Sequence, residues 1–130
     1  MIYVIDSCSL IAFLWDEPGS DLVETLLMSL NTCFVHTINL CEVYYDLLRR
    51  TEAVKAEKLL KIITDLVIVR NDMDFWKEAG KYKAELKRIS LADCFCIALA
   101  KRIGATVVTS DHHEFDKVNT LGIVSVLFIR

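Results

Sequence analysis

Five short apolar runs, spread over the whole chain, constrain the fold more than any other feature of the sequence. The runs are Ile2–Ile5, Cys33–Thr37, Leu66–Arg70, Thr106–Thr109 and Ser125–Ile129. They are nearly continuous rather than alternating, which is typical of strands whose two faces are both buried. We therefore expect a sheet that is covered on both sides.

Helical patterns lie between these runs. In the clearest one, Asn39–Arg50, the apolar side chains recur at the spacing of one buried helical stripe: Leu40, Val43, Tyr44, Leu47 and Leu48. The other helical segments are Asp21–Leu30, Thr51–Thr64, Asp72–Arg88 and Leu91–Arg102. Strands that alternate with helices need crossover connections, so the sequence predicts an α/β fold with a parallel sheet and helices on both faces.

The length and apolar content predict one domain over residues 1–130. A chain of 130 residues is close to the usual size of a single domain. Hydrophobic residues make up 54% of it, enough to fill a core and to leave apolar surface for a partner to cover. No apolar stretch approaches the roughly 18 residues that span a bilayer, and the first residues do not form a secretory signal. We expect no membrane association.

The cysteines indicate a reducing compartment. The chain has 5 of them, an odd number, and no Cys-x-x-Cys pair. This pattern favours neither a disulfide framework nor a structural zinc site. We expect reduced thiols and a cytoplasmic protein.

Four acidic residues fall where the predicted strands end or the next helices begin. Asp6 closes the first apolar run and Asp111 follows the fourth. Glu42 lies in the first turn of the helix after the second run, and Asp93 is the only charge in an otherwise apolar helical segment. Because ligands bind beyond the carboxyl ends of parallel strands, we expect these four carboxylates to converge at one edge of the sheet.

Four neighbouring carboxylates need a counter-charge, because like charges raise each other's pKa steeply. Hard divalent cations with oxygen ligands meet this need, and Mg²⁺ or Mn²⁺ are the natural candidates. Two such ions would offset four negative charges, so the net charge of −3 does not exclude a polyanionic partner. Carboxylate-bound metal ions suit the hydrolysis of phosphodiesters.

Each acid also has a purely local interpretation. Ser90 with Asp93, and Asn39 with Glu42, have the spacing of capping boxes, in which the acid satisfies backbone N–H groups. Asp6 could cap the turn into the next helix, and Asp111 could form a turn. The placement of an acid at the end of an apolar strand, and of another alone in an apolar helix, favours the metal site.

Four segments resemble the motifs of PIN domains, the ribonuclease fold of VapC-type toxins. They are Val4–Leu14, Asn39–Tyr45, Ile89–Cys94, and Val107–Asp111 together with Phe115 and Asp116. The resemblance runs from Met1 to about Phe128. It implies a five-stranded parallel sheet, RNA cleavage that depends on Mg²⁺ or Mn²⁺, a homodimer, and inhibition by a small antitoxin protein.

The resemblance also implies roles for individual residues. The catalytic, metal-holding acids would be Asp6, Glu42, Asp93 and Asp111, with Asp116 as a weaker fifth candidate. Ser7 and Ser110 occupy positions where the family often has a small hydroxyl residue that positions a carboxylate. Cys8 departs from the family, which more often has asparagine or serine there. No acid of the motifs is missing, so nothing indicates an inactive copy.

Two other enzyme classes with acids at a sheet edge do not fit. A haloacid-dehalogenase-type phosphatase needs a second aspartate where Cys8 stands, and a response-regulator receiver needs a lysine near the last strand, where Val126–Arg130 has none. The remaining alternative is a PIN-like module that binds RNA or protein without cleaving. Metal-dependent RNA cleavage would separate the two.

Basic residues are a further candidate feature. Six of them could follow an RNA backbone, although solvated helix faces are the more frequent explanation for such charges. They are Arg49, Arg50, Lys81, Lys83, Lys87 and Arg88.

Overall fold

The structure, a computed structural model that covers residues 1–130, contains a sheet of five parallel strands. The strands are β1 (Ile2–Ile5), β2 (Thr32–His36), β3 (Ile68–Arg70), β4 (Thr106–Thr109) and β5 (Val126–Phe128). Their order across the sheet is β3-β2-β1-β4-β5, and all four pairings are parallel. The predicted α/β class and the parallel sheet are confirmed.

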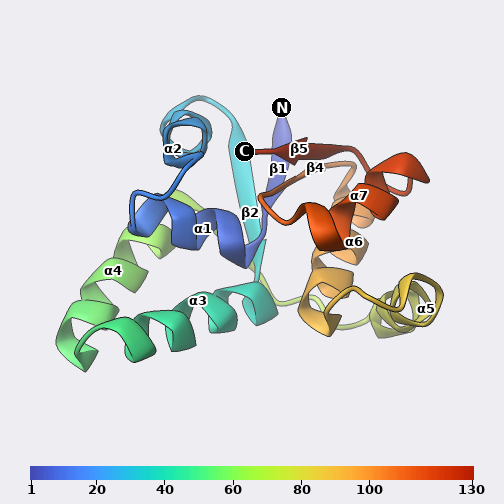
Figure 1. Cartoon of the computed structure of the whole chain (residues 1–130). Helices are drawn as coiled ribbons and strands as arrows, with labels where there is room; N and C mark the ends of the chain where they lie inside the picture. The colour runs from blue at the N-terminus through green and yellow to red at the C-terminus, as the bar shows by residue number, and fades with distance from the viewer.

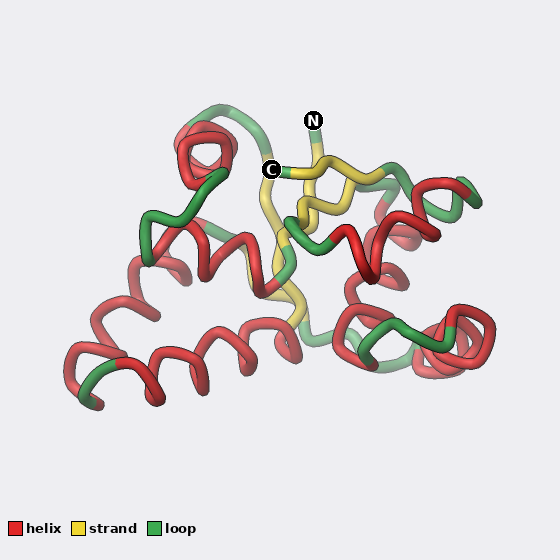
Figure 2. Tube along the Cα trace, viewed as in Figure 1, coloured by secondary structure: helices red, strands yellow, loops and turns green.

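Seven helices cover the two faces of this sheet (Figures 1 and 2). On one side lie α1 (Ser7–Leu14), α2 (Ser20–Met28), α3 (Thr37–Arg50) and α4 (Ala53–Leu66). On the other side lie α5 (Trp76–Leu86), α6 (Leu91–Ile103) and α7 (His112–Thr120). None of the helices has the length and apolar character needed to cross a membrane.

The sheet separates two hydrophobic cores. Neighbouring residues of a strand face opposite sides of a sheet, so Val4 and Ile5 of β1 enter different cores. Val4 packs in the core that includes Phe95 and Phe115, whereas Ile5 packs in the core that includes Leu47. This double burial explains why the strand sequences are continuously apolar.

The observed boundaries differ from the expected ones at two helices. Helix α4 continues to Leu66, and the Val67 N–H still donates to the Ile63 carbonyl, so β3 begins only at Ile68. Helix α5 begins at Trp76 rather than at Asp72, because the Asp72 carboxylate is paired with the guanidinium group of Arg70 in the connecting segment.

Helix α1 is not among the expected helices, and neither is α7, because the local interpretation of Asp111 is a turn. Only two of its side chains, Phe115 and Val118, are buried, and the rest of the segment is polar. One buried pair over nine residues gives too weak a periodic pattern to indicate a helix. The Asp111 carboxylate caps the helix by accepting the Glu114 N–H, 3.1 Å from N to Oδ1.

Candidate metal centre

The sheet topology brings acids from distant parts of the chain to one edge. Asp6 directly follows β1 and caps α1, and Asp111 lies two residues after β4 and caps α7. Because β1 and β4 are neighbours in the sheet, both acids leave it at the same end. The first turns of α3 and α6 carry Glu42 and Asp93.

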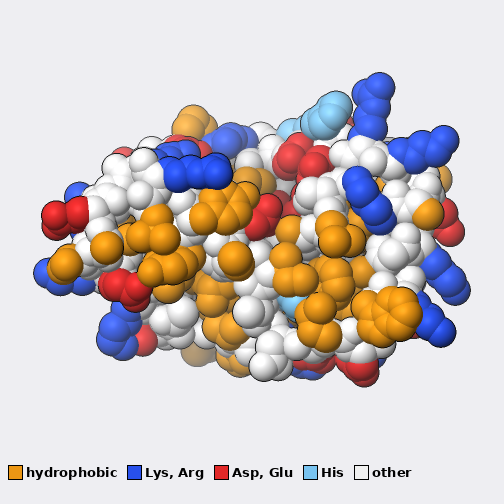
Figure 3. Space-filling view, turned by 90° about the horizontal axis from the view of Figure 1, so that it is seen from below, with side chains coloured by type: hydrophobic (Ala, Val, Ile, Leu, Met, Phe, Trp, Pro, Cys, Tyr) orange, Lys and Arg blue, Asp and Glu red, His pale blue; other side chains and the backbone are white.

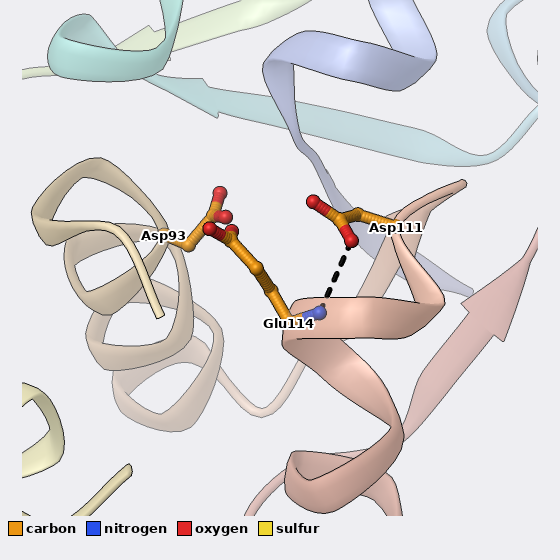
Figure 4. Close-up of side chains that lie close together, drawn as sticks. All are labelled: Asp93, Asp111 and Glu114. Carbon is orange, nitrogen blue, oxygen red and sulfur yellow. Dashed lines mark hydrogen bonds between the residues drawn. The ribbon is translucent and has the colours of Figure 1, made fainter. Parts of the chain in front are cut away.

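Three carboxylates form the tightest group. Asp93 at the start of α6, and Asp111 and Glu114 at the start of α7, each offer an oxygen atom, and these atoms lie within 4.8 Å of one another (Figure 4). Two of them are expected site residues, whereas the sequence reasoning missed Glu114. A signal for Glu114 exists, since an acid three residues after an aspartate N-cap has the spacing of a capping box.

The carboxylate of Asp93 is not used as a cap. Ser90 Oγ accepts the Asp93 N–H, 3.1 Å away, as in a capping box. The reciprocal bond is made by a different acid, because the Ser90 N–H donates to Glu114 Oε1, 3.2 Å away. Asp93 is only 6% exposed, yet its carboxylate takes part in no hydrogen bond or ion pair and faces the other two acids. The capping interpretation of Asp93 is therefore wrong.

Asp6 is buried and held by three donors. Its carboxylate accepts the Ser9 N–H at 2.9 Å, the Cys8 thiol at 3.0 and 3.1 Å from its two oxygens, and the Thr109 hydroxyl. Burial raises the pKa of Asp6 above its usual value, against the lowering effect of these hydrogen bonds. The local interpretation is correct in that Asp6 does cap α1.

Glu42 is oriented from two sides. Ser7 Oγ donates to Glu42 Oε1 at 2.9 Å, as expected for a hydroxyl that positions a carboxylate. The buried Asn39 amide donates to the same oxygen and to the Ala92 carbonyl, both at 3.3 Å, and so links α3 to the turn that carries Asp93. Asn39 lies inside α3, whose N-cap is His36, so the predicted capping box does not form.

Thr109 connects two of the expected acids and was also missed by the sequence reasoning. Its hydroxyl donates to the Asp6 carboxylate and accepts the Asp111 N–H, 3.0 Å away. It is fully buried at the end of β4. One hydroxyl thus fixes the relative position of the segments that carry Asp6 and Asp111.

Cys8 makes a polar contact with Asp6, although it stands where the family more often has asparagine or serine. Besides its contact with Asp6, its sulfur lies 3.1 Å from Ser110 Oγ, so Ser110 contacts the thiol and not a carboxylate. Burial and the neighbouring Asp6 carboxylate raise the pKa of Cys8 to about 12. The group is therefore a protonated thiol that donates to Asp6.

Asp116 lies apart from the other acids. Its carboxylate is exposed on α7 and contacts His112 Nδ1 at 2.9 Å. The structure does not bring it to the group formed by Asp93, Asp111 and Glu114.

The acids of the site form no ion pair with a basic side chain. Burial raises the pKa of Glu114, and the carboxylates of Glu42 and Asp6 raise it further. None of the ion pairs in the structure includes Asp6, Glu42 or the three grouped acids. A cluster of carboxylate oxygens with no basic partner fits a hard divalent cation such as Mg²⁺ or Mn²⁺.

Replacing Thr109 with valine is expected to lower the free energy of unfolding by about 1–3 kcal/mol. Valine keeps the shape but removes the hydroxyl that serves Asp6 and the Asp111 N–H. Urea unfolding followed by circular dichroism measures the loss. Thr109→Ser keeps the hydroxyl and should be the more stable of the two variants. A valine variant as stable as the parent would show that this link is dispensable.

Comparison with known proteins agrees with this architecture. The family model of the PIN domain matches residues 3–121. The chain is similar to VapBC2 from Rickettsia felis, solved with a DNA fragment from its promoter, at 20% identity over 98% of both chains and a TM-score of 0.79. It is similar to VapBC-1 from nontypeable Haemophilus influenzae at 18% identity, covering 99% of this chain and 98% of that one, with a TM-score of 0.76.

A third similar structure is VapC20 from Mycobacterium tuberculosis, described as a sarcin–ricin loop cleaving toxin. Its identity is 17%, the match covers 82% of this chain and 87% of that chain, and the TM-score is 0.67. No curated protein sequence matches the chain. The family model spans most of the sequence, and the sheet and helices have the arrangement of these VapC structures, so the chain belongs to the PIN domain family.

Proposed function

We propose that the protein is a ribonuclease that hydrolyses RNA phosphodiester bonds with the help of Mg²⁺ or Mn²⁺, and that it is the toxin of a toxin–antitoxin pair. The observation that carries the proposal is the carboxylate of Asp93. It is nearly buried, makes no hydrogen bond or ion pair, and faces the carboxylates of Asp111 and Glu114. A side chain in this position has no structural role that a neutral residue would not fill better.

In this proposal the acids divide into two sets. Asp93, Asp111 and Glu114 hold a cation directly, while Asp6 and Glu42 lie beside them, with Glu42 oriented by Ser7 and Asn39. A divalent cation bound there would supply an activated water and positive charge beside the scissile phosphate.

The N-terminus of α6 lies at the same place. Helix N-termini favour anionic groups, because their free N–H groups and their dipole are positive. The first turn of α6 thus suits the approach of a phosphate from the same side as Asp93.

RNA as the substrate has support beyond the site. The PIN family match extends over nearly the whole chain, and VapC20, which has this fold, is described as cleaving the sarcin–ricin loop. The likeness supports a nuclease of RNA but does not carry over that particular target, since the identity is 17%.

A small antitoxin and a second copy of the chain are the proposed partners. The similar structures from Rickettsia felis and Haemophilus influenzae are VapBC assemblies. The chain also has an open apolar hollow of about 250 Å³ between α3 and α4, lined mainly by Leu40, Cys41, Tyr44 and Leu60. The cysteines of the chain are all free, as is usual for proteins of the cytoplasm.

Two measurements on the purified protein test the proposed reaction. Mn²⁺ should raise the midpoint of thermal unfolding, because a ligand that binds only the native state stabilises it by about 2.7 kcal/mol at one hundred times its dissociation constant. A chelator should reverse the rise. Cleavage of total RNA should occur with Mg²⁺ or Mn²⁺ and stop with the chelator.

Two outcomes would contradict the proposal in different ways. A midpoint that does not respond to millimolar Mn²⁺ would show that the acids do not form a metal site. RNA that is bound but never cut, with either metal, would identify a non-catalytic PIN-like module.

A further inference from the structure

A second pocket opens directly beside the candidate metal centre. It has a volume of about 200 Å³, several times the roughly 30 Å³ that one water molecule occupies in the liquid. It is lined by the end of α5, the loop that follows, and α7: Leu86, Lys87, Arg88, Ile89, His113, Glu114 and Lys117. Glu114 belongs both to this pocket and to the acidic group, so the two sites adjoin.

The basic side chains of this pocket have no acidic partner. Lys87, Arg88 and Lys117 take part in none of the ion pairs of the structure. Arg88 is the one arginine with neither a carboxylate partner nor an aromatic ring beneath its guanidinium group. Arg49 lies over the ring of Tyr45, and the remaining ones pair with carboxylates, namely Arg50, Arg70, Arg102 and Arg130.

The loop that carries Lys87 and Arg88 is held in an unusual shape. Lys87 has φ 59° and ψ −53°, which is unfavourable for a residue with a side chain. The Nζ of Lys83 donates to the carbonyls of Lys87 and Ile89, at 3.2 and 2.6 Å, and so braces the loop. The Ser90 N–H then ties the loop to Glu114. Lys83 thus stabilises the loop through its backbone carbonyls, while Lys87 and Arg88 line the pocket.

We propose that this pocket binds a backbone phosphate of the RNA, next to the phosphate that is cleaved. The inference rests on the proposed function. The net charge of the chain is −3, so a polyanion needs a local cationic site in order to bind. Figure 3 shows Asp and Glu side chains near the middle of one face, with Lys and Arg side chains to their right, on the half of α5, α6 and α7.

An RNA backbone fits this pair of sites better than an acidic peptide does. Two successive phosphates of one RNA strand suit two adjoining sites. One phosphate lies in the basic pocket, and the next lies beside a metal ion held by the acids, with Glu114 between the two sites. Of the basic residues that the sequence offered for RNA, Arg50 is neutralised by Asp46 and Arg49 stacks on Tyr45. Lys83 holds the loop, and of the other three only Lys87 and Arg88 line the pocket, to which the structure adds Lys117 and His113.

The test compares two double variants in an Asp93→Asn background, in which cleavage is expected to be slow enough for binding to be measured. The first, Arg88→Gln with Lys117→Gln, removes two cations from the pocket. The control, Lys55→Gln with Lys58→Gln, removes the same charge from exposed positions of α4, which lies across the sheet. The probe is a short fluorescein-labelled single-stranded RNA of mixed sequence, and fluorescence anisotropy gives the dissociation constant over a range of salt concentrations with Mg²⁺ present.

The pocket variant should bind on the order of fivefold to tenfold more weakly at low salt, equally for different RNA sequences. Its plot of log affinity against log salt should be shallower by about 0.7, the contribution of one single-strand phosphate. The control should match the Asp93→Asn parent. The rise in melting midpoint caused by Mn²⁺, measured with Asp93 intact, should be unchanged by Arg88→Gln and Lys117→Gln, because these residues hold phosphate and not metal.

Two results would contradict phosphate binding in the pocket without contradicting the proposed cleavage of RNA. They are equal affinities and salt slopes for the pocket variant and its parent, or an equal weakening in the α4 control. If no form of the protein binds RNA, the proposed function fails, and the phosphate pocket fails with it.

Discussion

The Asp93→Asn variant should cleave RNA slower than the parent by on the order of a hundredfold or more. Asparagine keeps the size of the side chain but removes one negative charge from the group that Asp93 forms with Asp111 and Glu114. The free energy of unfolding without metal should stay the same or rise, because repulsion between the carboxylates is relieved. Initial cleavage rates and urea unfolding measure the two effects.

Asp93→Asn is not expected to lower the free energy of unfolding, because the Asp93 carboxylate does not cap a helix. The bond to Ser90 uses the Asp93 backbone N–H, which asparagine retains. Asp116→Asn is a matched control, since Asp116 is an exposed aspartate outside the acidic group, and it should cleave at close to the parent rate. An Asp93→Asn variant that cleaves at the parent rate but unfolds more easily would reverse the roles assigned here.

The Phe115→Ala variant should lose about 3–5 kcal/mol of stability. Phe115 is fully buried in the core between the sheet and α5, α6 and α7, and alanine would leave a cavity there. The loss is a large part of the roughly 5–15 kcal/mol that stabilises a typical domain. Denaturant unfolding measures it, and metal binding should weaken as well, because Phe115 anchors the helix whose first turn carries Asp111 and Glu114.

Leu121→Ala provides the comparison for Phe115. Leu121 follows the same helix but is 59% exposed, so its truncation should change the stability by about 0.5 kcal/mol or less. If both variants lost the same amount, α7 would not be anchored through Phe115.

Much of the fold follows from local sequence patterns. The five strands were expected within two residues of their observed ends, because residues such as Val4 and Ile5 enter two different cores and must both be apolar. Helix α7 left no such pattern, since only Phe115 and Val118 are buried. Its existence depends on Phe115 finding a place in a core built from distant segments.

The candidate site was predictable in outline only. Asp6 and Asp111 could be placed at the sheet edge because parallel strands end together, and the structure puts them there. The roles of Thr109 and Glu114 depend on contacts between segments about one hundred or about twenty-four positions apart, which no local spacing encodes. Whether the Asp93 carboxylate caps its helix could be decided only from the structure, because Glu114 and not Asp93 accepts the Ser90 N–H.

The order in which these acids occur along the chain has a consequence for synthesis. Asp6 precedes α1, whereas Asp111 and Glu114 lie about one hundred residues later in the chain, at the start of α7. Domains fold as their chains emerge, N-terminal parts first. A fragment that ends before Asp111 therefore has no complete acidic group, because two of its three members are missing.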